Sequence, residues 1–296
     1  MFQHASLLAE LKKWSLTKPI RSSAVFVLLA VMIIGGCTTI NREYKDREPA
    51  CTTELKCIGQ KIYKNETGGK LENLIFWSPS EAFPSLGIGH FIWYPAAEKQ
   101  GFKEAFPDLV RHLQANGAQV PLWLSRQIQI GSLWNSREQM EQDRGGRRFR
   151  ELQQLLLDTT DLQTTFLFER LDKALPTMLS AVNPESRALI TNRFNTMKAS
   201  SGGLYPLVDY VNFKGEGTVM AERYNGQGWG LLQVLENMQA VPAGQQALQE
   251  FSRAADYVLS RRVENAAPEK NEQRWLPGWR VRLNTYHVAP DKPKWL

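Results

Sequence analysis

An acidic residue, two glycine-containing turns and several aromatic rings lie within one stretch of the chain, 64–95. Glu66 precedes Gly68 and Gly69, and a Gly87–His90 turn follows. Cleavage of a glycosidic bond needs a carboxylic acid that protonates the leaving oxygen, and an apolar surround keeps such an acid protonated. Glu66 is therefore a candidate general acid, with a pKa expected to be raised. The alternative is an exposed glutamate at the end of a helix.

The segment Ser85–His90, with the sequence SLGIGH, resembles the turn that follows the catalytic glutamate in phage-type lysozymes. That pattern is Glu, then an acidic residue, then Thr-x-Gly-x-Gly-His. The resemblance implies that Ser85, in place of Thr, holds the attacking water and that His90 lies on the substrate side. Glu81, which precedes the turn, is the preferred second carboxylate, and Glu72 is the alternative. The loop before Gly87 is a few residues longer than in the phage enzymes.

Two further segments resemble family 19 chitinases, in which the lysozyme-like fold recurs. NETGG, with Asn65, is similar to their His-Glu-Thr-Gly-Gly segment, and ERYNGQGWGLLQVLENM is similar to their Tyr-x-Gly-Arg-Gly-x-x-Gln-Leu segment. Amides and rings separated by glycines suit both the hydroxyl edges and the C–H faces of sugars. The expected substrate-binding residues are Tyr224, Asn225, Gln227, Trp229 and Gln233. A glycine-rich turn opening a buried helix is the other interpretation, and Asp209 and Asn212 are expected on the same wall.

The N-terminal segment predicts export. Four basic residues precede the apolar run Ala24–Ile34, which is too short for a comfortable membrane span. Ile34–Cys37 resembles a bacterial lipobox, which implies a signal peptide over 1–36, lipidation of Cys37 and an anchor in the outer membrane facing the periplasm. A plain membrane anchor with a chance cysteine is the alternative. Residues 37–50 are polar and aperiodic, as expected of a tether.

Two cysteines, Cys51 and Cys57, remain after Cys37, and an oxidising compartment favours a disulfide between them over free thiols.

The net charge of +6 includes +3 from 1–36 (four Lys/Arg minus one Asp/Glu), which leaves +3 for the exported part. This excess is too small to indicate nucleic-acid binding and suits an anionic wall. Four histidines without ligand spacing argue against a metal site, and no cofactor motif is present.

The pattern of apolar residues predicts mostly helices, in one domain over 51–296. A helix is expected over 53–66, ended by Gly68-Gly69, and a short β-hairpin or irregular ribbon over 74–93. A C-terminal strand is expected around Trp279, Val281 and Leu283. Helices are further expected over 104–117, 136–160 with a break at Gly145-Gly146, 161–175, 185–200 with an Asn183-Pro184 start, and 243–265. The fold class expected is mainly α with a small β insertion (α+β), and the resemblance makes it lysozyme-like.

These features lead to one main hypothesis. The chain is expected to be an enzyme, a peptidoglycan-cleaving lipoprotein that acts as a glycoside hydrolase or, if no second carboxylate faces Glu66, as a lytic transglycosylase. A non-catalytic peptidoglycan-binding lipoprotein is the alternative, and an unrelated helical lipoprotein is the third possibility. Oligomeric state is left open by the sequence.

Overall fold

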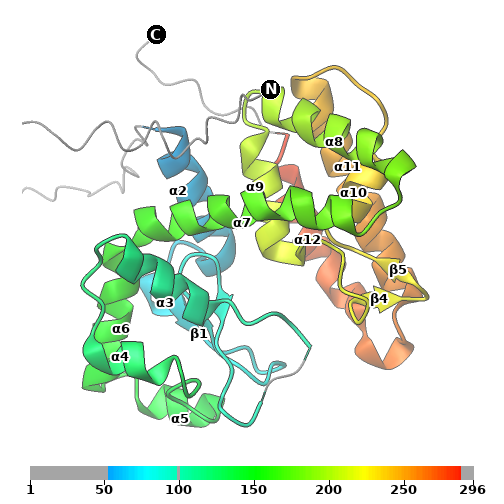
Figure 1. Cartoon of the computed structure of the whole chain (residues 1–296). Helices are drawn as coiled ribbons and strands as arrows, with labels where there is room; N and C mark the ends of the chain where they lie inside the picture. Colours follow the sequence, from blue (N-terminus) through cyan, green and yellow to red (C-terminus); the bar gives the residue numbers. More distant parts are fainter. Residues whose placement is uncertain (1–52, 99–100, 288–296) are drawn as a thin grey trace, which may run out of the picture. The chain divides into compact units, whose positions relative to one another are not determined.

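The computed structural model describes residues 53–98 and 101–287 (Figure 1). This part of the chain is mainly helical with a small β insertion near its start, as expected, and it has a second, two-stranded antiparallel sheet that was not expected. The α-helices are α2 (Glu54–Thr67), α3 (Phe106–Ala115), α4 (Leu122–Gln127), α5 (Arg137–Gln142), α6 (Arg147–Asp158), α7 (Thr160–Ser180), α8 (Pro184–Ala199), α9 (Leu204–Lys214), α10 (Leu231–Asn237), α11 (Gln245–Asn265) and α12 (Leu276–Asn284). The 3₁₀ turns are η2 (Leu71–Leu74), η3 (Pro268–Lys270) and η4 (Glu272–Trp275).

Helix α2 begins and ends where the sequence predicts. The Thr53 hydroxyl accepts a hydrogen bond from the Lys56 amide, which satisfies one of the unpaired donors of the first turn. Ile58 and Ile62 face the core, one turn apart. Gly68, at φ 65°, closes the C-terminus in the left-handed conformation that residues with a Cβ avoid. This cap leaves Glu66 in the last turn.

The expected ribbon over 74–93 is a three-stranded antiparallel sheet. Its strands are β1 (Ile75–Phe76), β2 (Ser85–Leu86) and β3 (Phe91–Ile92), in the order β1-β2-β3. Ser85 lies opposite both Phe76 and Ile92. The turn 87–90 joins β2 to β3 and so projects from the sheet next to the end of α2.

Helix α7 is the element around which the others are arranged, because it contacts α2, α3, α8 and α9 (Figure 1). The sequence predicted an end before Pro176, and this is wrong: the helix continues through Pro176 to Ser180. The ring removes one backbone donor near the end of the helix, but the last turn buries Met178 completely. Burial of that side chain offsets the loss.

The C-terminal part is also helical, which contradicts the predicted strand. Leu276 and Leu283 are buried two turns apart in α12, whereas Val281 is 70% exposed. The alternation of apolar residues at Trp279, Val281 and Leu283 therefore does not mark a strand. The buried residues of this segment follow the periodicity of a helix. Helix α12 packs against α11, the long amphipathic helix that the sequence predicted.

Candidate functional site

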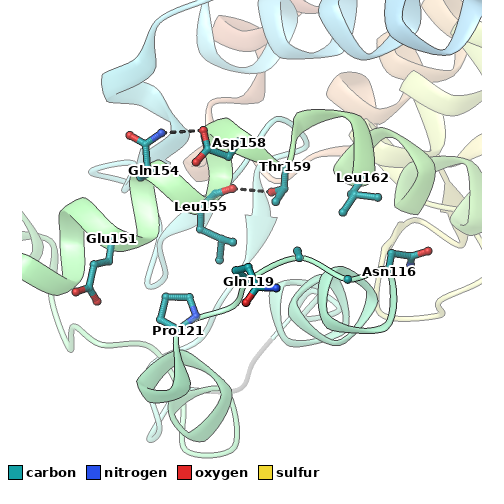
Figure 2. Close-up of a pocket in the computed structure, with 11 residues that line it drawn as sticks. Asn116, Gln119, Pro121, Glu151, Gln154, Leu155, Asp158, Thr159 and Leu162 are labelled. Atoms are coloured by element: carbon teal, nitrogen blue, oxygen red, sulfur yellow. Dashed lines mark hydrogen bonds between the residues drawn. The ribbon is translucent and has the colours of Figure 1, made fainter. Parts of the chain in front are cut away.

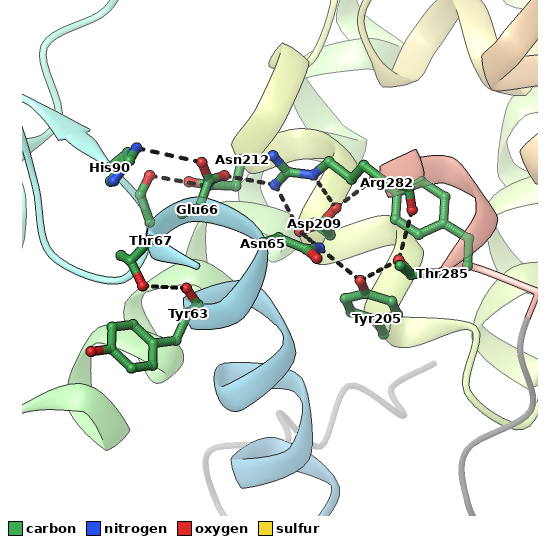
Figure 3. A network of polar contacts seen from close by, with 12 residues as sticks. Tyr63, Asn65, Glu66, Thr67, His90, Tyr205, Asp209, Asn212, Arg282 and Thr285 are labelled. Carbon is green, nitrogen blue, oxygen red and sulfur yellow. Dashed lines mark hydrogen bonds and ion pairs between the residues drawn. The ribbon is translucent and has the colours of Figure 1, made fainter. Parts of the chain in front are cut away.

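The site is centred on Glu66, where α2 meets α9 and α12. Arg282 Nη2 donates to Glu66 Oε1 at 2.6 Å, and Asn212 Nδ2 donates to the same oxygen at 3.2 Å. The other oxygen, Oε2, lies 3.6 Å from His90 Nδ1 (Figure 3). One oxygen is thus held by two donors, and Oε2 has only the His90 ring beside it among these contacts.

Arg282 binds a second carboxylate as well. Its Nε and Nη2 donate to the two oxygens of Asp209 at 2.7 and 2.8 Å, in a two-pronged contact. Asp209 has no exposed surface and also accepts from the Tyr286 hydroxyl and the Asn65 amide. Asp209 therefore fixes the orientation of Arg282 and is shut off from any substrate.

The charge state of Glu66 differs from the expectation. Burial by itself would raise its pKa, but the Arg282 and His90 charges and the hydrogen bonds from Arg282 and Asn212 outweigh burial, so the pKa lies below its ordinary value. Glu66 is consequently ionised at neutral pH in this arrangement. The expectation of a raised pKa is corrected, because sequence showed the apolar neighbours but not the guanidinium.

The turn 87–90 is attached to α7 by a fully buried glutamine. Gln163 Oε1 accepts from the Ile88 amide at 2.9 Å, and its Nε2 donates to the Leu156 carbonyl at 2.6 Å. A Cβ on Gly87 would meet that Oε1 at 2.3 Å, and Gly87 has φ 74°. The glycine at this position is therefore required by both conformation and space.

His90 has φ 48°, which is unusual for a residue with a side chain. Its Nε2 lies 3.3 Å from the Asn73 carbonyl, and its ring stacks on Phe76 with the planes 9° apart. Because a carbonyl only accepts, Nε2 carries a hydrogen in this contact. Nδ1 is then the ring nitrogen that faces Glu66 Oε2, at 3.6 Å.

The other predicted catalytic residues make no contact with Glu66 in the described part of the chain. Ser85 is buried in the central strand β2. Glu81 is exposed to solvent. Protein atoms around its carboxyl group partly remove water from it, and this desolvation raises its pKa. Its backbone carbonyl accepts from Trp77 Nε1. Glu72, the alternative, is exposed in η2.

The predicted sugar-binding segment forms a tight hairpin. Strands β4 (Arg223–Tyr224) and β5 (Gln227–Gly228) are joined by Asn225 and Gly226, whose φ values of 49° and 74° make the two-residue turn that Asn-Gly favours. The Asn225 amide donates to the Asn265 side chain. This segment is thus a glycine-rich turn followed by a buried helix, α10, which was the other interpretation of its sequence.

Rings and amides that follow the hairpin are engaged within the chain. Trp229 is buried, and the Arg262 guanidinium lies over its ring at 4.1 Å. Gln233 is buried and bonds to the Gly230 amide and the Gly217 carbonyl. The Tyr224 hydroxyl donates to Glu272, while Gln227 is exposed. Sugar binding by these residues stays a prediction.

The sequence predicted Asp209 and Asn212 on the wall formed by the sugar-binding segment, and the structure places both beside Glu66. The sequence did not predict Arg282, which joins Asp209 to Glu66. Arg282 lies in α12, in a segment that was expected to be a strand. A strand has a different periodicity from a helix, so the prediction did not indicate which way Arg282 points. The only signal for it was chemical: a buried carboxylate pair requires a cation. Tyr205 and Thr285, whose hydroxyls bond to each other at 2.6 Å, complete the network through Asn65 (Figure 3).

A separate cavity of about 530 Å³ lies between α6 and the segment 116–121 (Figure 2). It is lined by residues such as Pro121, Leu155 and Leu162, and Glu151 and Asp158 stand at its edge. None of the residues that contact Glu66 lines it. In the described residues no group of His, Cys, Asp and Glu has the arrangement of a metal site.

Most of the residues on which the prediction of export and lipid anchoring depends lie outside the described residues. Cys57, in α2, is disulfide-bonded. Its expected partner Cys51, the lipidation residue Cys37, the signal peptide and the tether all lie outside the described residues. Within the described ranges, none of the helices has the length and apolar character that crossing a bilayer requires.

Comparisons with known proteins returned no match to a family model, a curated protein or a solved structure. The resemblance to phage-type lysozymes and family 19 chitinases therefore rests on the residues quoted above.

Proposed function

We propose that this chain cleaves the glycan strands of peptidoglycan, as a lipoprotein of the outer membrane that faces the periplasm, with a lysozyme-like fold. The observation that carries the proposal is the meeting of Glu66 with the Ser85–His90 turn, at 3.6 Å between Glu66 Oε2 and His90 Nδ1. In the proposed reaction, Glu66 Oε2 delivers the proton to the bridging oxygen. Oε1 stays bound to Arg282, which keeps the carboxyl group in one orientation.

The ionised state of Glu66 has to change before it acts as an acid. A sugar that covers the site removes water from the carboxylate, and this favours the protonated form. His90 supplies a neighbouring nitrogen through which the proton reaches Oε2. The general acid is thus formed in the complex with substrate, which the pH profiles below test.

Hydrolysis and lytic transglycosylation differ in whether a second carboxylate activates water. Asp209, the carboxylate that shares Arg282 with Glu66, is completely buried and is also bound by Tyr286 and Asn65. It is unsuited to water activation, so that role falls to Glu81 or is absent. New reducing ends among the products indicate hydrolysis, and intramolecular anhydro ends indicate transglycosylation.

The same ion pair supports a second candidate function. The ion pair between Arg282 and Glu66 is stable without any turnover. A non-catalytic peptidoglycan-binding lipoprotein would have such a pair. A zymogram in peptidoglycan separates the two. Clearing by the wild type and not by Glu66→Gln supports the enzyme, and retention on sacculi without clearing supports the binder. If the protein neither clears peptidoglycan nor is retained on sacculi, both candidate functions are contradicted.

A further inference from the structure

Lys214, the last residue of α9, is a cation without an acidic partner. In the described part of the chain no carboxylate lies within ion-pair distance of its ammonium group. The group instead lies over two aromatic rings, 3.9 Å from the centre of Phe213 and 4.0 Å from that of Trp279. A lysine at the end of a helix ordinarily extends into water, so this inward placement is a specific feature.

The charges around Lys214 are already matched to one another. Arg262 forms an ion pair with Glu272 at 2.6 Å, and Arg282 is bound to Asp209 and Glu66. Burial, followed by the repulsion of Arg262 and Arg282, lowers the pKa of Lys214 well below its ordinary value, and Glu272 and Glu66 only partly oppose this. This environment therefore favours the neutral amine, and an incoming anion would favour the protonated form.

Lys214 is also close to the candidate catalytic carboxylate. The Arg282 guanidinium lies over the same Phe213 ring, at 4.2 Å from its centre, and bonds directly to Glu66. Asn212, two positions before Lys214, bonds to Glu66 as well. Phe213, Lys214 and Trp279 are all partly exposed.

We propose that Lys214 binds a carboxylate group carried by the glycan next to the bond that Glu66 cleaves. This inference rests on the proposed function and narrows its substrate class to an acidic glycan, as opposed to a neutral chitin-type polymer. Such a carboxylate has two sources in peptidoglycan: the lactyl ether on alternate sugars, or the peptide attached to it. Nζ of Lys214 lies over the Phe213 and Trp279 rings, so the anion meets a nitrogen whose position is already set.

The test is a binding titration of the full chain carrying Glu66→Gln, so that no ligand is cleaved. Three soluble glycans of equal length serve as probes: an N-acetylglucosamine oligomer, a glycan with free lactyl carboxylates and no peptide, and the glycan with its peptide. Lys214→Met is expected to weaken binding of an acidic glycan about tenfold, as for the loss of one charge-assisted contact. Lys214→Arg should retain most of the affinity.

Lys198→Met, an exposed lysine in the last turn of α8, is the matched control for loss of one positive charge. A tenfold loss for the lactyl glycan assigns the lactyl group, and a loss only for the peptide-bearing glycan assigns the peptide. Equal losses for neutral and acidic glycans, or no loss at all, overturn the inference. If wild type clears peptidoglycan while Lys214→Met keeps its affinities, only the inference fails. If no probe binds and nothing is cleared, the proposed function fails as well.

Discussion

Arg282 and Glu66 form an ion pair at 2.6 Å between residues 216 positions apart in the chain. The same guanidinium binds the fully buried Asp209, so a single side chain in α12 pairs with two carboxylates, one from α2 and one from α9. This relationship fixes the last helix onto the candidate site, and it makes the site part of the fold's stability.

Replacement of Arg282 should therefore be strongly destabilising. Arg282→Met leaves Asp209 charged, buried and without its cation, which costs about 3–5 kcal/mol in comparable cases. Denaturant unfolding monitored by circular dichroism measures the loss. Arg282→Lys keeps the charge but not the two-pronged geometry and should lose less. Equal stability of wild type and Arg282→Met would contradict the ion-pair account.

Acid should weaken the contribution of Glu66 to stability. Its folded pKa is lowered, so the stabilisation is fully present above the unfolded value of about 4.5 and is lost as pH falls through the folded pKa. The difference in unfolding free energy between wild type and Glu66→Gln should thus shrink as pH falls below 4.5. Urea titrations at pH 7, 4.5 and 3 measure it, and a difference independent of pH would contradict the ion-pair account.

The proposed formation of the acid in the complex predicts two different pH profiles. The basic limb of kcat/KM reports the free enzyme, where the pKa of Glu66 is low, so this limb should lie at acidic pH. The basic limb of kcat reports the complex and should lie at higher pH, because substrate excludes water from Glu66. Initial rates on soluble glycan across pH 3–8 test this. Superimposed limbs would show that substrate leaves the carboxyl unchanged.

His90 offers a test that separates backbone strain from proton transfer. His90→Asn keeps a residue that tolerates φ 48°, so folding should be preserved while turnover falls about 100-fold for loss of a proton-transfer group. His90→Ala should add a stability loss of about 1–2 kcal/mol from the left-handed backbone. Melting temperatures and kcat are measured together. Unchanged kcat in His90→Asn would remove the ring from the mechanism.

Gln163 should act as a positioning residue for the turn. Gln163→Leu leaves the Ile88 amide and the Leu156 carbonyl without their partners in a buried place, each at a cost of about 1–3 kcal/mol. We expect lower stability, and a fall in kcat that exceeds any change in KM, because the turn carries His90. Gln153→Leu, at a glutamine whose bond to the Leu71 carbonyl is exposed, is the control and should change neither.

Local sequence determined several elements of this protein. The Thr53 cap, the apolar spacing of Ile58 and Ile62, and Gly68 specify α2 and place Glu66 in its last turn. Asn225-Gly226 specifies the hairpin between β4 and β5. These features follow from contacts within a few residues, which the order of residues alone encodes.

Tertiary structure decided the state of the site. Apolar neighbours of Glu66 in sequence pointed to a raised pKa, yet Arg282, brought from α12, reverses the direction. Pro176 lies inside α7 because Met178 beyond it is buried in the core. In both places a contact between distant segments outweighs the local preference, since burial and Coulomb interactions depend on spatial neighbours. The sequence by itself predicted that Glu66 and the turn 87–90 lie together, and the packing of α9 and α12 determined the charge of Glu66.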